Sequence, residues 1–475
     1  MLQRRICRKM IRMKSIASAL SIMALGFGLL ACSGGGGGGG GSSSAFAVST
    51  TSANFGVVNN AYTSTLATTG GTAPFTWTLF GGALPTNLTI DQMTGVVSGT
   101  PTTAGNFTAT FTVTDNMGQT ANGSVLFAIH PRTDVVSTDN STPPVPGVGA
   151  SSTPSISSDG RFVAFASSAT LIPGISGSQI YIHDWQTNQT SLVSRSTVGN
   201  AGDGASSQPS ISSNGQFVTF TSLATNLAAT PGGSGTQIFL RDTQANTTLL
   251  VSRIGLGNAG DGASSQPSIS SNGQFVTFTS ASSNLTGDPN PGQFQIFLRD
   301  TQSNTTTLVS QATGGAVGDG ASNQPSISSN GQFVTFTSLA TNLAATLGGS
   351  GTQIFLRDTQ ANTTTLISQD TIGNAGNGGS SQPSISSNGQ FVTFTSLATT
   401  LAAAPGGSGT QIFLRDTQVN TTSLVSQTAV GGNAGNGASS QPTMSDNGRF
   451  VAFSSVSTNF GAAGGNQQIY VRAVP

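Results

Sequence analysis

Ser326-Ile-Ser-Ser-Asn-Gly-Gln-Phe-Val-Thr-Phe336 is one copy of a motif that recurs along most of this chain. Its Asn-Gly pair is the strongest short signal for a β-hairpin, and it separates two runs of strand-forming residues. Each copy therefore predicts two antiparallel strands joined by a tight turn. The equivalent copies are Ser155 to Phe165, Ser210 to Phe220, Ser268 to Phe278, Ser384 to Phe394 and Thr443 to Phe453, the last with Met444 in place of Ile.

A repeat of about 58 residues surrounds this motif and occurs six times. Its anchor is a proline, and the successive spacings are 55, 58, 58, 58 and 59 residues for Pro154, Pro209, Pro267, Pro325, Pro383 and Pro442. In the second repeat, Gln237–Asp242 predicts a third strand and Thr248–Ser252 a fourth. Four strands with apolar residues on both faces suit a β-propeller blade, because each blade packs between two neighbours.

The repeat begins one strand early and ends one strand short. Complete repeats end in a segment such as Thr307–Ser310, and the sixth repeat lacks it because the sequence stops at Pro475. A matching segment, Asp134–Ser137, precedes the first repeat. A linear stack has no use for this arrangement, whereas a ring can use the early strand to complete the last blade. We therefore expect an all-β fold in which a six-bladed propeller is closed by an N-terminal strand.

The repeated motif resembles the TolB-like, WD-repeat-like β-propellers, and the resemblance covers residues 132 to 475. The motif is characteristic of the fold and not of any one activity. TolB-like propellers work with other proteins of the bacterial envelope, so the resemblance implies a partner-binding role.

Residues 45 to 131 do not repeat and predict a separate domain. Strand-like runs alternate with turn clusters every 8 to 12 residues, which is the rhythm of a small β-sandwich. The motifs Pro74-Phe-Thr-Trp77, Ser98-Gly-Thr-Pro101 and Val113-Thr-Asp115 resemble the Ig-like, cadherin-like domains of bacterial surface proteins. Trp77 is expected in the core. Asp115 is expected to be a turn residue, with Ca²⁺ binding as the alternative.

Residues 1 to 31 read as a lipoprotein signal peptide. A basic start precedes an apolar stretch, Ile16 to Leu30, which is too short to span a membrane. Leu29-Leu-Ala-Cys32 resembles a lipobox, so we expect Cys32 to be the lipid attachment site, carrying acyl chains such as palmitate. Residues 32 to 44 are then a Gly/Ser tether with a reach of roughly 20 Å. Ser33 favours the outer membrane by resemblance to lipoproteins of Gram-negative bacteria.

Charge argues against a nucleic-acid partner. The formal net charge is zero, but six of the sixteen basic residues lie in the first 14 positions. All sixteen acids are Asp and lie beyond residue 90, so the mature chain carries about six more negative than positive charges. Such a chain offers no basic face to phosphates.

Few residues suggest catalysis. The two histidines, His130 and His183, have no acid or base partner suggested by sequence, and His183 occupies the position of Arg241 in the second repeat. No hydrolase motif and no Cys/His metal cluster is present, so we predict no catalytic residue, metal or cofactor. The recurring Arg-Asp pairs predict fold-supporting contacts, with the Asp fixing the next turn. Ca²⁺ is the alternative for three loop acids, Asp203, Asp261 and Asp319.

Topology sorts the predicted loops onto two faces. The turns after strands one and three are short, whereas the loops after strands two and four, such as residues 222 to 236 and 311 to 322, are long and Gly-rich. We expect the long-loop face to contact a partner. The favoured function is a lipid-anchored, non-enzymatic module for adhesion or protein binding. The alternatives are a periplasmic scaffold for other envelope proteins and a propeller-type hydrolase or lyase.

Overall fold

The computed structural model describes nine stretches of the chain, which are residues 45–131, 135–142, 144–228, 233–287, 292–344, 350–402, 407–429, 432–461 and 466–474. The predicted signal peptide, Cys32 and the Gly/Ser tether lie outside them. Within the described stretches, no helix has both the length and the apolar character needed to cross a bilayer.

The N-terminal part is a two-layer β-sandwich, as the sequence predicts. One sheet has the order β2-β9-β8-β5 and the other β3-β7-β6, with a small β1-β4 pair at the edge. Trp77, Phe111 and Phe127 are buried between the layers, which confirms Trp77 as a core residue. The strands are β1 (Ala47–Val48), β2 (Gly56–Val57), β3 (Tyr62–Thr65), β4 (Thr68–Thr69), β5 (Thr76–Gly82), β6 (Leu88–Ile90), β7 (Val96–Gly99), β8 (Gly105–Thr114) and β9 (Thr120–His130).

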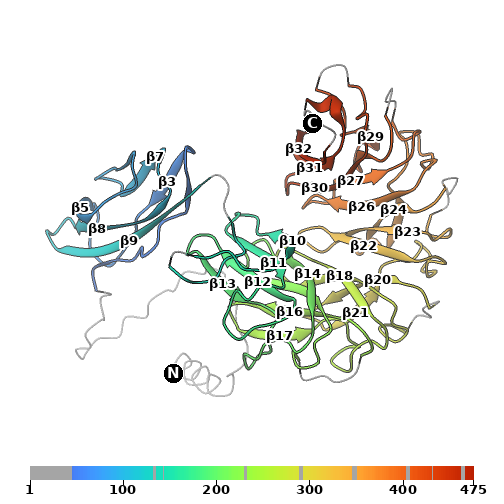
Figure 1. Cartoon of the computed structure of the whole chain (residues 1–475), viewed down its shortest axis with the longest axis horizontal. Coiled ribbons are helices and arrows are strands. Elements are labelled where there is room, and N and C mark those ends of the chain that lie inside the picture. The colour runs from blue at the N-terminus through green and yellow to red at the C-terminus, as the bar shows by residue number, and fades with distance from the viewer. Residues whose placement is uncertain are drawn as a thin grey trace, which may run out of the picture.

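The repeats form six antiparallel sheets that fan around a common centre, with the first strand of each sheet innermost (Figure 1). We number them as blades one to six. Five blades have four strands and the sixth has three among the described residues. The first strands are β10 (Ser151–Ile156), β14 (Ser206–Ile211), β18 (Ser264–Ile269), β22 (Ser322–Ile327), β26 (Ser380–Ile385) and β30 (Ser439–Met444).

The remaining strands follow in the same order in every blade. The second strands are β11 (Phe162–Ser167), β15 (Phe217–Ser222), β19 (Phe275–Ser280), β23 (Phe333–Ser338), β27 (Phe391–Ser396) and β31 (Phe450–Ser455). The third are β12 (Gln179–Asp184), β16 (Gln237–Asp242), β20 (Gln295–Asp300), β24 (Gln353–Asp358), β28 (Gln411–Asp416) and β32 (Gln468–Ala473), and a 3₁₀ turn, Thr458–Phe460, precedes β32. The fourth are β13 (Gln189–Leu192), β17 (Thr247–Leu250), β21 (Thr305–Leu308), β25 (Thr363–Leu366) and β29 (Thr421–Leu424).

The turn between the first two strands explains why glycine is present in all six copies of the motif. In blade four, Gly331 has φ +78°, and a Cβ there would lie 2.2 Å from the ring of Phe275 in blade three. Only glycine combines that conformation with so close an approach. The turn therefore shapes the hairpin and also lets successive blades pack together.

A buried lock inside each complete blade holds its third strand, and an apolar layer joins that strand to the next blade. After the fourth strand of blade three, Ser310 Oγ donates to Gln295 Oε1 (2.6 Å) and accepts from the backbone N–H of Ile296 (2.9 Å). Ile296 then packs with Ile327 of blade four. The same Ser–Gln lock occurs in the other four complete blades at Ser194, Ser252, Ser368 and Ser426.

The predicted closing strand is not confirmed by the described residues. Asp134 lies outside them, and Val135, Val136 and Ser137 belong to no strand. Thr138 is buried against blade one, where its carbonyl accepts a hydrogen bond from Thr190 Oγ1 (2.8 Å). The described segment before blade one therefore leads into blade one. Strand β32 remains an edge strand of the sheet of blade six.

The sandwich contacts blade one through an aromatic cluster. Trp185 lies 4.8 Å from His130 and 5.8 Å from Phe55 between ring centroids, and Gln186 donates to Ser52 Oγ (3.1 Å). Trp185 stands where blades two to five have Thr, so blade one departs from the repeat at the point of domain contact. This cluster accounts for His130, which is a buried interdomain residue.

Candidate functional site

The recurring Arg-Asp pairs hold the propeller together, as predicted. Arg241 is buried and donates to Asn246 O (3.0 Å) and Thr248 Oγ1 (3.0 Å), and its guanidinium also reaches Ser196 O in the loop from blade one. Asp242 points the other way and accepts from the N–H groups of the following turn at 2.9 Å. The arginine thus bridges two blades and the aspartate fixes a turn.

The buried arginines stay charged at neutral pH. Burial, followed by the neighbouring Arg195, lowers the pKa of Arg241 to about 10, against the smaller opposing effect of Asp242. In blade one, His183 replaces this arginine, and its Nδ1 lies 3.0 Å from Thr190 Oγ1, the counterpart of Thr248. The geometry therefore agrees with a structural substitution at His183.

The predicted alternatives for Ca²⁺ are engaged in structural hydrogen bonds. Asp203 accepts from the backbone N–H and the hydroxyl of Thr225, both at 2.6 Å, which lowers its pKa. Asp261 and Asp319 repeat this contact, and Asn377 and Asn436 make it without a charge. A carboxylate is therefore not needed at this position. Across the described stretches, no group of three His, Cys, Asp or Glu side chains is placed to hold a metal ion.

Asp115 in the sandwich is also a turn residue. It accepts hydrogen bonds from the backbone N–H groups of Thr72, Met117 and Gln119 at 2.8 to 3.0 Å. Burial raises the pKa of Asp115, but these three donors outweigh it and the pKa lies below its ordinary value. The carboxylate fixes the β8–β9 turn, as the sequence indicates.

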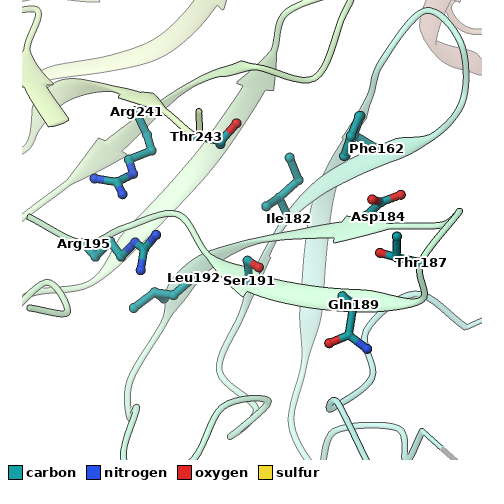
Figure 2. A pocket seen from close by; sticks show the side chains of 10 residues that line it. All are labelled: Phe162, Ile182, Asp184, Thr187, Gln189, Ser191, Leu192, Arg195, Arg241 and Thr243. Atoms are coloured by element: carbon teal, nitrogen blue, oxygen red, sulfur yellow. The ribbon is translucent and has the colours of Figure 1, made fainter. Parts of the chain in front are cut away.

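A groove of about 270 Å³ lies between blades one and two (Figure 2). Figure 2 shows Arg195 and Arg241 on one side of it and Asp184 on the other. Both arginines donate to Asn246 Oδ1, at 2.8 and 2.9 Å. An equivalent groove of about 290 Å³, with Arg415 in the place of Arg241, lies between blades four and five. The groove is therefore a feature of the repeat and not a single specialised site.

The prediction that both long loops lie on one face is only half correct. The loop after the second strand lies there, but the first part of the loop after the fourth strand turns onto the next blade. Thr313 Oγ1 in this loop accepts from the N–H of Thr364 (3.0 Å) at the start of β25. The strand order predicts correctly where this loop begins and ends. The hydrogen bond of the Thr313 hydroxyl, which directs the path of the loop, could not be recognised in the sequence.

The loop after the second strand places exposed leucines on the long-loop face. Leu223, Leu339 and Leu397 occupy equivalent positions directly after β15, β23 and β27, and each is more than half exposed. The next residues, such as Ala340 and Leu343, are buried and anchor the loop. Repeated apolar side chains on an anchored loop are typical of a contact surface.

The same face holds a cavity that sequence reasoning missed. It measures about 270 Å³ and is lined by the Gln-Pro pairs of blades two to four and by Thr153 and Pro154 of blade one. Because equivalent residues of four successive blades share it, the cavity lies around the propeller axis. The repeated Gln before each anchor proline was the signal, visible at Gln208, Gln266, Gln324, Gln382 and Gln441.

A family model matches the N-terminal part of the chain. Residues 41–130 match the family model described as Putative Ig domain. No curated protein matches the sequence. A protein assigned as TolB from Agrobacterium tumefaciens shares 16% identity at a TM-score of 0.38, over 70% of this chain and 92% of its own.

Other structural neighbours are enzymes. The oligogalacturonate lyase of Vibrio parahaemolyticus shares 11% identity at a TM-score of 0.38, covering 78% of this chain and 86% of its own. Prolyl oligopeptidase B of Galerina marginata shares 10% identity at a TM-score of 0.40, over 69% and 43% respectively. These similarities are weak, and the propeller architecture rests on the six sheets themselves.

Proposed function

We propose that this protein is a lipid-anchored, non-enzymatic envelope protein whose propeller binds a partner protein through its long-loop face. The observation that carries the proposal is the exposure of Leu223, Leu339 and Leu397, which occupy equivalent positions on anchored loops of blades two, four and five. The repeated arginines and aspartates support it, because they are engaged in holding blades and turns together.

The binding face is tested by site-specific photo-crosslinking in cells. A photoreactive phenylalanine replaces Leu339 on the long-loop face, and in a matched variant it replaces Val419, which is equally exposed but lies in the turn after the third strand. We expect a discrete crosslinked band from position 339 and none from position 419. Bands from both positions, or from 419 alone, would contradict the proposal.

The lipid anchor is tested at Cys32. We expect Cys32→Ser to abolish incorporation of labelled palmitate and to move the protein from the membrane fraction to the soluble fraction. Cys7→Ser, at the only other cysteine, is the control and should leave both unchanged. Protease treatment of whole cells then separates a surface adhesin, which is cleaved, from a periplasmic scaffold, which is protected.

A further inference from the structure

The glutamines of the axial cavity share an unusual backbone conformation. Gln208, Gln266, Gln324 and Gln382 have φ between 53° and 55°, a region that non-glycine residues rarely adopt. Each sits in a bulge of the innermost strand, just before a buried proline. Gln441 (φ 54°) and Thr153 (φ 49°) share this conformation at the equivalent position, so it belongs to the bulge of all six blades.

Hydrogen bonds between neighbouring blades fix which end of each of these carboxamides is already bonded. Gln266 Oε1 accepts from the backbone N–H of Gln324 (2.9 Å) in the next blade and from Thr279 Oγ1 (3.1 Å) in its own. A backbone N–H can only donate, so the atom that meets it must be the oxygen. Gln208, Gln324 and Gln382 accept from the next blade in the same way, at 2.9 to 3.0 Å.

The side-chain amide nitrogens of these glutamines are therefore available to donate hydrogen bonds to a ligand. None of these four Nε2 atoms donates a hydrogen bond to any residue in the described stretches. The side chains of Gln208, Gln266 and Gln324 line the cavity, and the prolines beside them are its apolar wall. The lining side chains thus present several N–H donors around one axis, with their carboxamide oxygens already occupied.

Donors that surround an axis suit a compact group that carries several acceptor lone pairs. A carboxylate has about four such positions, and hydrogen bonds to a charged acceptor are stronger than those between neutral groups. Exposed aspartates lie on the same face, five residues before each of three glutamines: Asp203, Asp261 and Asp319. Their pKa values are lowered by hydrogen bonds from Thr225, Ser283 and Thr341, so they are ionised at neutral pH.

We propose that the glutamine ring, formed by the side chains of Gln208, Gln266 and Gln324 around the cavity, captures the C-terminal carboxylate of a partner protein whose preceding residues are basic. The ring receives the carboxylate, the prolines pack against the terminal side chain, and the aspartates attract the basic residues. The proposal rests on the proposed function, because it names the chemistry of the partner that reaches this face.

The test is calorimetric titration of the full-length protein in detergent with the peptide acetyl-Lys-Lys-Ala-Ala. We expect the free-acid peptide to bind at least tenfold more tightly than the same peptide with a C-terminal amide. Gln266→Glu combined with Gln324→Glu keeps the oxygens that accept from the next blade and replaces the two donors with negative charge. We expect this variant to lose at least tenfold in affinity.

The matched control adds the same charge to the same blades at the other face. Gln302 and Gln360 lie in the turns after β20 and β24, and their side chains are exposed. Gln302→Glu combined with Gln360→Glu should bind the free-acid peptide as the wild type does. Equal affinity of the two double variants would overturn the proposal, as would equal affinity for the acid and amide peptides.

Two further outcomes are decisive. If glucuronate displaces the free-acid peptide at equal concentration, the ring recognises carboxylates in general and the assignment to a protein terminus is wrong. If the wild type does not bind the free-acid peptide, the inference fails, whereas a crosslink at position 339 would still support the proposed function.

Discussion

Five junctions between successive blades are packed, and the sixth, between blades six and one, is open. Ile296 on β20 is fully buried against blade four, whereas its counterpart Ile469 on β32 is 72% exposed. On the receiving side, Ile327 is 8% exposed and its counterpart Ile156 is 60% exposed. All four side chains are isoleucines, so the difference in their exposure arises from the residues that surround them.

Among the described residues, blade six differs from the other five blades in having no Ser–Gln lock. In the five complete blades, the serine after the fourth strand holds the third strand and directs the chain into the next blade. Blade six retains Gln468 and Ile469, but its sheet has three strands among the described residues, and β32 has no fourth strand beside it. Packing between blades therefore depends on the fourth strand and not on apolar residues alone.

The open junction is bridged only at its inner end among the described residues. Ser158 Oγ of blade one donates to Asp446 Oδ2 of blade six (2.6 Å). At the equivalent position blades two to five have serine, and a backbone hydrogen bond joins blade one to blade two there, from Ser158 N–H to Ser213 O (3.0 Å). The Asp446 side chain, which is longer than that of serine, reaches Ser158 where no backbone hydrogen bond of the described residues joins the two blades.

The largest expected contrast is between Ile296→Ala and Ile469→Ala. Removing a fully buried isoleucine side chain costs about 2–5 kcal/mol of unfolding free energy, because it leaves a cavity. The same change at an exposed position costs less than about 0.5 kcal/mol. Denaturant unfolding followed by fluorescence measures both. Equal losses would show that the sixth junction packs like the other five, and would support the predicted closing strand.

A smaller contrast is expected between the serines of the two kinds of junction. Ser310→Ala leaves the buried N–H of Ile296 and the Gln295 carboxamide without a partner, which costs about 1–3 kcal/mol. Ser137 is the counterpart of Ser310, because it precedes blade one as Ser310 precedes blade four. In the open junction, Ser137→Ala should change the unfolding free energy by less than about 0.5 kcal/mol. A loss at Ser137 as large as that at Ser310 would indicate a sixth lock, from Ser137 to Gln468.

The sequence predicted the blades well because their determinants are local. The Asn-Gly turns, the apolar run in Gln353–Asp358 and the Asp that fixes each turn are all visible within a few residues. The path of the loop after the fourth strand and the orientation of the glutamine ring were not predicted. Both depend on single hydrogen bonds to a neighbouring blade, such as that between Gln266 and Gln324, which leave no periodic pattern in the sequence.

The smallest expected effect concerns an ion pair that sets blade one apart. Arg161 donates to both carboxylate oxygens of Asp184, at 2.8 and 2.7 Å, whereas in blade two the neutral side chain of Gln216 donates to Asp242. Burial raises the pKa of Asp184, but the hydrogen bond and charge of Arg161, with the N–H of Gln186, bring it below its ordinary value.

Arg161→Gln converts this pair into the arrangement of blade two. A lowered carboxyl pKa stabilises the fold above the unfolded-state value of about 3.9, and this contribution is lost as pH falls through the folded-state pKa. Because the Arg161 side chain is 34% exposed, we expect a loss of at most about 1 kcal/mol at pH 7, which shrinks below pH 4. Urea unfolding at pH 7 and pH 3 measures it. Arg449→Gln is the control, since in blade six Ala473 occupies the position of Asp184 and offers no carboxylate, and its effect should not depend on pH. A loss at Arg161 that is the same at both pH values would exclude the ion pair as its cause.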